Sequence, residues 1–207
     1  MLMHAAHVPA QEMGNEVSWL LPAEAPMPRL IKEPRLFGGN MPAGDSEREL
    51  IDLVRAGRVK EVKETLALGT RANAQDIEGR RPLHEAVVAG HQEITRLLLR
   101  AGADPNAGNA YGRSALDMAI LHGRDRIVPM LLEYGADLEL RNGIGNTPLV
   151  SALLLQRDDM ARLFMQRGAR LDARSGDKRC VAELAATHAG EALLQEILQQ
   201  GGAEVCQ

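Results

Sequence analysis

Three series of glycines share a spacing of 33 residues, and this period constrains the fold more than any other feature of the chain. The series are Gly57, Gly90 and Gly123; Gly79, Gly112 and Gly145; and Gly69, Gly102, Gly135, Gly168 and Gly201. A fixed period of roughly 20 to 50 residues is typical of arrays in which each unit packs on its neighbours. The sequence therefore predicts a repeat array, not a single globular core.

Each repeat divides into two short helices and a loop. In the clearest copy, the apolar pattern predicts helices over Pro82–Ala89 and Gln92–Arg100. Proline is tolerated at the start of a helix because its missing N–H would be unsatisfied there, and Pro148 repeats this placement. The Asn, Asp and Gly residues of segment 104–112 favour a hairpin loop. We therefore expect an all-α repeat solenoid of helix-turn-helix units joined by β-hairpin loops, with the loop tips on one edge.

Polar end units are expected because the outer faces of a stack meet water. We predict five units at about 46–74, 75–107, 108–140, 141–173 and 174–205, of which the first and last are caps rich in charged residues or in Gln and Glu. Residues 1–45 hold most of the prolines, lack the repeat register and are expected to be largely disordered. Apolar islands such as Trp19–Leu21 leave three interpretations open there: a docking motif for a partner, an arm that folds back on the solenoid, or a misassigned start codon.

One stretch carries a family resemblance. Residues Asp76–Ala107 read DIEGRRPLHEAVVAGHQEITRLLLRAGADPNA and closely resemble the ankyrin repeat. The family's TPLH element corresponds to Arg81–His84 and, more weakly, to Thr147–Val150, and the resemblance covers about residues 46–205. It implies a non-enzymatic protein-binding fold in which His84 forms hydrogen bonds within and between hairpins.

The resemblance also implies a binding surface, because partners of the family usually contact the hairpin tips and the exposed face of the first helix in each unit. These elements line a concave groove. The register places the following candidate partner-binding residues there: Ile77, Glu78, Arg80, Ala110, Tyr111, Arg113, Leu121, His122, Gly143, Ile144, Asn146, Leu154 and Leu155. In the last unit Lys178 replaces the tip glycine, which leaves the shape of that loop open.

Several of these candidates are apolar where exposure to water would favour polar residues, which is typical of an interaction surface. Tyr111 is the expected anchor, since tyrosine buries ring area and keeps a hydroxyl for hydrogen bonding. Arg80 and Arg113 flank it and could take a carboxylate, so we expect a partner with an apolar ridge and some acidic character. For Leu121, Leu154 and Leu155, packing between helices is an equal alternative.

Other classes of function are disfavoured by what the sequence lacks. The formal net charge is −4 and no block of Lys or Arg occurs, so nucleic acid is not an expected partner. No stretch is long and apolar enough for a membrane span, and two cysteines give no disulfide framework, so a cytoplasmic protein is expected. The ligand spacing HExxH, the nucleophile motif GxSxG and the phosphate loop GxxxxGK do not occur. We predict no catalytic residues, no metal ligands and no cofactor.

The leading functional hypothesis is a monomeric intracellular adaptor or regulator that binds a partner protein through the groove and hairpin tips. The main alternative is a secreted bacterial effector that acts on a host protein. An enzyme whose site is completed by oligomerisation is the least favoured interpretation.

Overall fold

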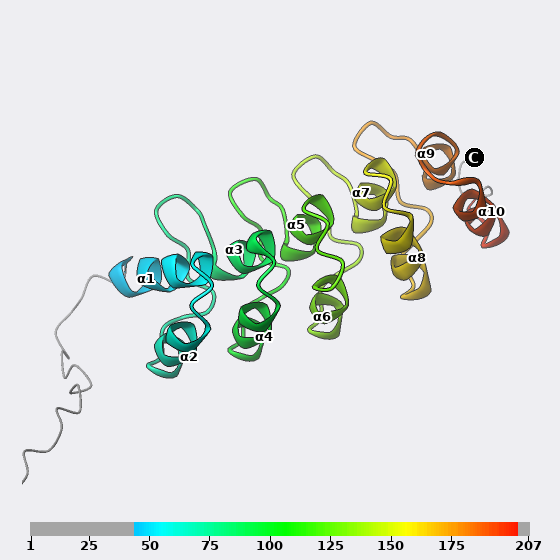
Figure 1. The fold of residues 1–207 in the computed structure, drawn as a ribbon. Helices are drawn as coiled ribbons and strands as arrows, with labels where there is room; N and C mark the ends of the chain where they lie inside the picture. Colours follow the sequence, from blue (N-terminus) through cyan, green and yellow to red (C-terminus); the bar gives the residue numbers. More distant parts are fainter. Residues whose placement is uncertain (1–43, 203–207) are drawn as a thin grey trace, which may run out of the picture. The chain divides into compact units, whose positions relative to one another are not determined.

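The computed structural model describes residues 44–202, in which ten helices form five antiparallel pairs (Figure 1). The pairs are α1 (Gly44–Arg55) with α2 (Val59–Ala67), α3 (Pro82–Ala89) with α4 (Gln92–Arg100), α5 (Ala115–Leu121) with α6 (Val128–Glu133), α7 (Pro148–Leu154) with α8 (Asp158–Gln166), and α9 (Val181–His188) with α10 (Glu191–Gln199). The predictions made for residues 1–43 lie outside the described residues.

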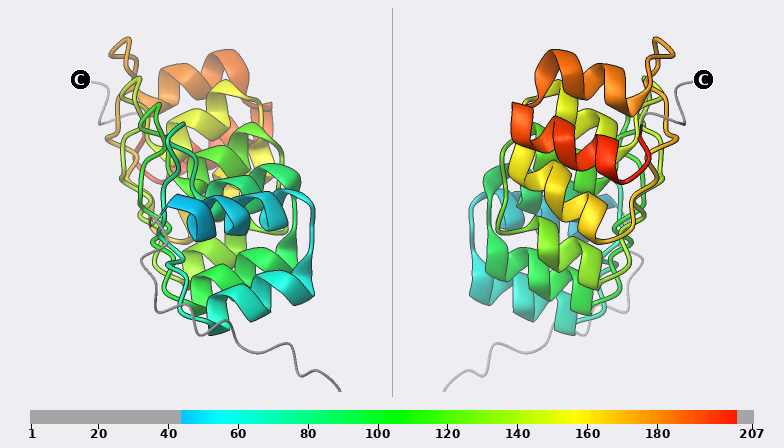
Figure 2. Two further views of the ribbon diagram at one scale, coloured as in Figure 1. Left: turned by 90° about the vertical axis from the view of Figure 1, so that its left-hand side faces the viewer. Right: turned by 90° about the vertical axis from the view of Figure 1, so that its right-hand side faces the viewer.

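The helix pairs stack in two layers. The odd-numbered helices lie side by side in one layer and the even-numbered helices in the other, and the loops between pairs project on one side (Figures 1 and 2). Helices α3 and α4 have the bounds that the apolar pattern predicts. The predicted all-α repeat solenoid is confirmed.

The loops differ from the expected β-hairpins. Within residues 44–202 no strand forms, and the only β pairing is an isolated bridge between Arg174 and Cys180. The loop tip is instead a tight turn, in which the N–H of Asp76 donates to the carbonyl of Arg80 at 3.0 Å. The same bond recurs in each of the three following loops, 33 residues apart. The last loop also keeps this turn, because Lys178 adopts the left-handed φ of 71° that glycine takes elsewhere.

Local sequence accounts for where the first-layer helices begin. The hydroxyl of Ser114 accepts the N–H of Asp117 at 3.2 Å, and Thr147 caps α7 in the same way. Such side chains satisfy amides that a helix start leaves without an intrahelical partner. In the second layer, Pro129 stands in the first turn of α6, so this helix has only six residues and starts late.

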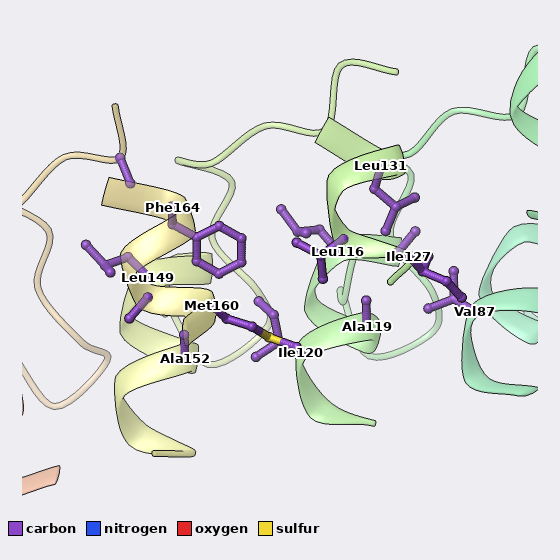
Figure 3. Packing of buried hydrophobic residues seen from close by; sticks show 14 of the residues in the cluster. Val87, Leu116, Ala119, Ile120, Ile127, Leu131, Leu149, Ala152, Met160 and Phe164 are labelled. Atoms are coloured by element: carbon purple, nitrogen blue, oxygen red, sulfur yellow. The ribbon is translucent and has the colours of Figure 1, made fainter. Parts of the chain in front are cut away.

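The core consists of aliphatic side chains between the two layers and between successive pairs. Figure 3 shows Leu116 and Ile120 of α5 packed near Phe164 and Met160 of α8, all of them fully buried or nearly so. Leu98 of α4 has no exposed surface either. A pair of helices this short buries its apolar face only against neighbouring pairs, so the core is continuous along the stack.

The loop tips stack as closely as the helices. A Cβ on Gly143, the second residue of its loop tip, would collide with the carbonyl oxygen of Tyr111 in the preceding loop, and a Cβ on Gly176 would collide with Ile144 in the same way. Ala110, the equivalent residue one loop earlier, is also small. Ile77 occupies this position in the first loop and is 93% exposed, since no loop precedes it among the described residues.

A series of asparagine hydrogen bonds, which sequence reasoning missed, joins successive repeats beyond the ends of the second-layer helices. The side-chain amide of Asn73 donates to the carbonyl of Gly102 at 2.8 Å, and its oxygen accepts the N–H of Asp104 at 2.7 Å. Asn106 makes the same two bonds one repeat later. The signal was a recurrence of asparagine at the repeat period.

We predict that Leu98→Ala lowers the free energy of unfolding by about 2 to 5 kcal/mol, because it opens a cavity that the stack cannot collapse around. Leu68→Ala is the matched control, since Leu68 is 80% exposed, and its effect should stay within about 0.5 kcal/mol. Urea unfolding monitored by far-ultraviolet circular dichroism measures both values. Equal effects of the two substitutions would contradict the assigned core.

We also predict that Gly143→Ala destabilises the protein by about 1 to 3 kcal/mol, because the added methyl group pushes against the backbone of the preceding loop. Gly108→Ala is the control, since the nearest atom to its added Cβ, the Cα of Gly112, would lie 3.4 Å away. The same urea titration distinguishes the two. A Gly143→Ala variant as stable as the wild type would show that the loops are not closely stacked.

Candidate partner-binding groove

A hollow of about 310 Å³ lies between the first two loop tips and the exposed faces of α3 and α5. We call it the loop–helix groove. It is lined by Glu78, Gly79, Arg80, His84, Glu85, Val88, Asn109, Ala110, Tyr111, Arg113, Met118, Leu121 and His122. Loop tips and first-layer helices are the elements that the family resemblance implies for binding.

Seven of the candidate residues line this groove together: Glu78, Arg80, Ala110, Tyr111, Arg113, Leu121 and His122. Sequence reasoning missed Glu85 and Met118, which lie three residues before Val88 and Leu121. Residues three or four apart share one face of a helix, so helical spacing would have found both.

The apolar part of the groove is centred on Tyr111, whose side chain is 78% exposed at a loop tip. The backbone beneath the ring is fixed, since the side-chain oxygen of Asn109 accepts the N–H of Tyr111 at 2.9 Å and that of Arg113 at 3.1 Å. Leu121 on α5 is 40% exposed, and Met118 is half-buried. The ring therefore stands on a rigid turn above an apolar floor.

The two arginines of the groove are already paired with acids of their own repeats. The Nε of Arg80 lies 2.7 Å from a carboxylate oxygen of Asp76, and the Nε of Arg113 lies 3.7 Å from one of Asp117. Burial alone would raise the pKa of Asp76, but hydrogen bonds from the backbone and side chain of Arg80 outweigh it and hold that pKa below its usual value. Each arginine thus has an internal counter-ion and braces its loop.

His84 joins helix α3 to the next loop. Its Nε2 lies 2.9 Å from the carbonyl oxygen of Arg113, so this nitrogen carries the proton and donates. Burial, helped by the nearby charge of Arg81, lowers the pKa of His84 and outweighs the opposing effect of this hydrogen bond. The contact between consecutive repeats is the one that the family resemblance implies, and it is burial that favours the neutral ring.

The remaining candidates lie outside the loop–helix groove. Ile144 is 64% exposed at the next loop tip and Leu155 is 43% exposed at the end of α7, whereas Leu154 packs partly against the core. Asn146 is 5% exposed and its side-chain oxygen accepts the N–H of Gly176 at 2.8 Å, so it braces two loops. Ile77 and Gly143 hold the loop-stacking positions described above.

From 44 to 202, no group of three or more His, Cys, Asp or Glu side chains lies close enough together to hold a metal ion. None of the helices that the structure describes has the length and apolar character needed to cross a membrane.

The burial of His84 makes the stability of the protein depend on pH. Its pKa in the folded protein lies below the value of about 6.5 in an unfolded chain, so the unfolded state binds more protons at mildly acidic pH. Stability contributed by neutral His84 is complete above about pH 6.5 and is lost as the pH falls below it. We expect urea midpoints measured from pH 8 to pH 5 to fall less steeply in His84→Gln than in the wild type.

The control is His122→Gln, which removes an exposed histidine and should keep the pH dependence of the wild type. Identical pH profiles for His84→Gln and the wild type would refute this role of the buried ring.

A sequence model described as ankyrin repeats in three copies matches residues 50–142, which include both loops and both first-layer helices of the groove. A search of curated proteins found no similar sequence. From this match and the stacked helix pairs of residues 44–202, residues 50–142 are ankyrin repeats, which are generally protein–protein interaction modules.

Proposed function

We propose that the protein is a non-enzymatic adaptor or regulator that holds a partner protein in the loop–helix groove and along the loop tips. The observation that carries this proposal is the exposure of Tyr111 and Ile144, at 78% and 64%, at equivalent positions of consecutive loops. Exposed apolar side chains that gather in one place mark interaction surfaces, whereas single ones need no explanation.

The two side chains belong to one row. The third residue of each loop tip is Glu78, Tyr111, Ile144 and Asp177 in turn, so the two apolar residues lie next to each other in the middle of the row. Leu121 and Leu155 extend the apolar surface from the loop tips onto α5 and α7. The surface therefore crosses two repeats, which suits a partner that lies along the stack.

The loops hold this row in place before any partner arrives. In the second and third loops, an asparagine side chain accepts two backbone N–H groups of its own tip, at 2.9 to 3.1 Å. The tips are also packed against one another through small residues. A surface ordered in advance loses less conformational freedom on binding, which favours affinity.

We expect the double substitution Tyr111→Ala/Ile144→Ala to reduce partner recovery roughly tenfold or more, because interface anchors of this kind each contribute about 2 kcal/mol or more. The full chain and the variant serve as baits in parallel pull-downs, and quantitative mass spectrometry compares the retained proteins. Thermal unfolding should be nearly unchanged, since both side chains are exposed.

The matched control is Tyr134→Ala/Leu68→Ala. It removes a tyrosine that is 37% exposed and a leucine that is 80% exposed, both at the ends of second-layer helices. This control should retain the partner. Equal recovery on the wild type and on Tyr111→Ala/Ile144→Ala would refute the groove as the binding surface.

A further inference from the structure

The pairing of charges around the loop–helix groove bears on the chemistry of its partner. Two bases line the groove, Arg80 and Arg113, and each has an acid from its own repeat as counter-ion, at 2.7 and 3.7 Å. Two further acids, Glu78 and Glu85, line the same surface. The groove and the two supporting acids together therefore carry two more negative than positive charges.

Glu78 is the less compensated of the two acids. Its carboxylate lies 3.4 Å from Arg80, but that guanidinium already holds Asp76 at the shorter distance of 2.7 Å. The side chain of Glu78 is 58% exposed, and it stands at the same loop-tip position as Tyr111 in the next repeat. The negative charge of Glu78 thus lies one loop away from Tyr111 and is accessible to a side chain of a partner.

Glu85 has a counter-ion from the preceding repeat, and the interaction is weak. Arg55 of α1 lies 3.4 Å away and its side chain is 52% exposed, so this pair is solvated and contributes little. Arg124 approaches the other end of α3, where its Nε donates to the carbonyl of Val88 at 3.1 Å. That carbonyl lies at the negative end of the helix, which offsets the charge of Arg124 locally.

We propose that the loop–helix groove binds an extended protein segment in which an apolar side chain is flanked by Lys or Arg. The apolar side chain lies against Tyr111 and the floor formed by Met118 and Leu121. The basic side chain reaches Glu78, with Glu85 adding to the attraction. This proposal rests on the proposed function and names the partner's chemistry. It reverses the acidic partner expected from the sequence, because the two arginines meet acids of the protein itself.

The opposite charge preference is the direct competitor. An acidic segment would have to displace Asp76 from Arg80. The side chain of Asp76 is only 4% exposed, and its carboxylate also accepts two backbone N–H groups. Breaking those contacts strands a buried charge, which costs far more than an exposed pair returns. A basic segment leaves the pair of Asp76 and Arg80 in place and competes only with the longer, more exposed contact between Arg80 and Glu78.

The test uses a phage library of random dodecapeptides panned against the full chain, followed by titration of fluorescent versions of the enriched peptides. We expect these peptides to carry Lys or Arg within three residues of a large apolar residue and to lose binding to Tyr111→Ala. Glu78→Gln should weaken binding about two- to fivefold at low salt. Added salt should reduce that difference, because exposed charges are screened.

A charge exchange makes the test sharper. Glu78→Arg should weaken the basic peptides further and should favour versions in which the critical Lys or Arg is replaced by Glu. Glu93→Gln is the control, since it removes an exposed acid from α4 in the other layer and should leave affinity unchanged. The fold is preserved in these variants because both side chains are exposed, and circular dichroism verifies it.

The outcomes separate the two proposals. Peptides that require Tyr111 but show no excess of Lys or Arg, or that bind Glu78→Gln and the wild type equally, would overturn the charge preference and leave the groove as the binding surface. Recovery of no peptide that depends on Tyr111 would overturn the proposed function, and this inference with it.

Discussion

Each helix pair depends on its neighbours, because two helices of six to twelve residues cannot enclose a core of their own. Apolar side chains such as Leu98, Leu131 and Phe164 are buried only when another pair lies beside them. Stacking is therefore a condition of folding in this chain. It also fixes the spacing of everything that the pairs carry, including the loops.

The loops inherit this spacing, which determines which side chains project from their tips. Because the second tip residue packs against the preceding loop, Gly143 and Gly176 must be small, and the third residue becomes the first one free to project. Tyr111 and Ile144 hold that third position. The proposed binding surface thus follows from loop stacking, and neither of its two central side chains contributes to the buried core.

Sequence reasoning predicted the parts of the structure that follow from local chemistry and from the period. The glycine series and the proline at the start of α3 gave the helix pairs, since both are direct backbone requirements. It did not predict the ion pairs that form inside each repeat. The bond between Asp76 and Arg80 joins residues close in sequence, but it depends on a turn whose geometry the sequence does not determine. The pairing of Asp117 with Arg113 depends on the direction in which α5 starts after its loop. The arginines therefore looked available for a partner when they were not.

These internal pairs also explain how a chain with nearly balanced charge presents a surface of one sign. Arg80 and Asp76 cancel within a single loop, and Arg113 and Asp117 do so in the next, so the four charges contribute rigidity and little field. The net charge at the groove is therefore determined by side chains that do not stabilise the loops, above all Glu78. The side chain of Glu78 has no such structural role, so it can be substituted without loss of the loop, whereas Asp76 accepts three hydrogen bonds from its own loop. The arginines of the groove are thus paired within the scaffold, and the proposed selectivity rests on the carboxylates that have no strong internal partner.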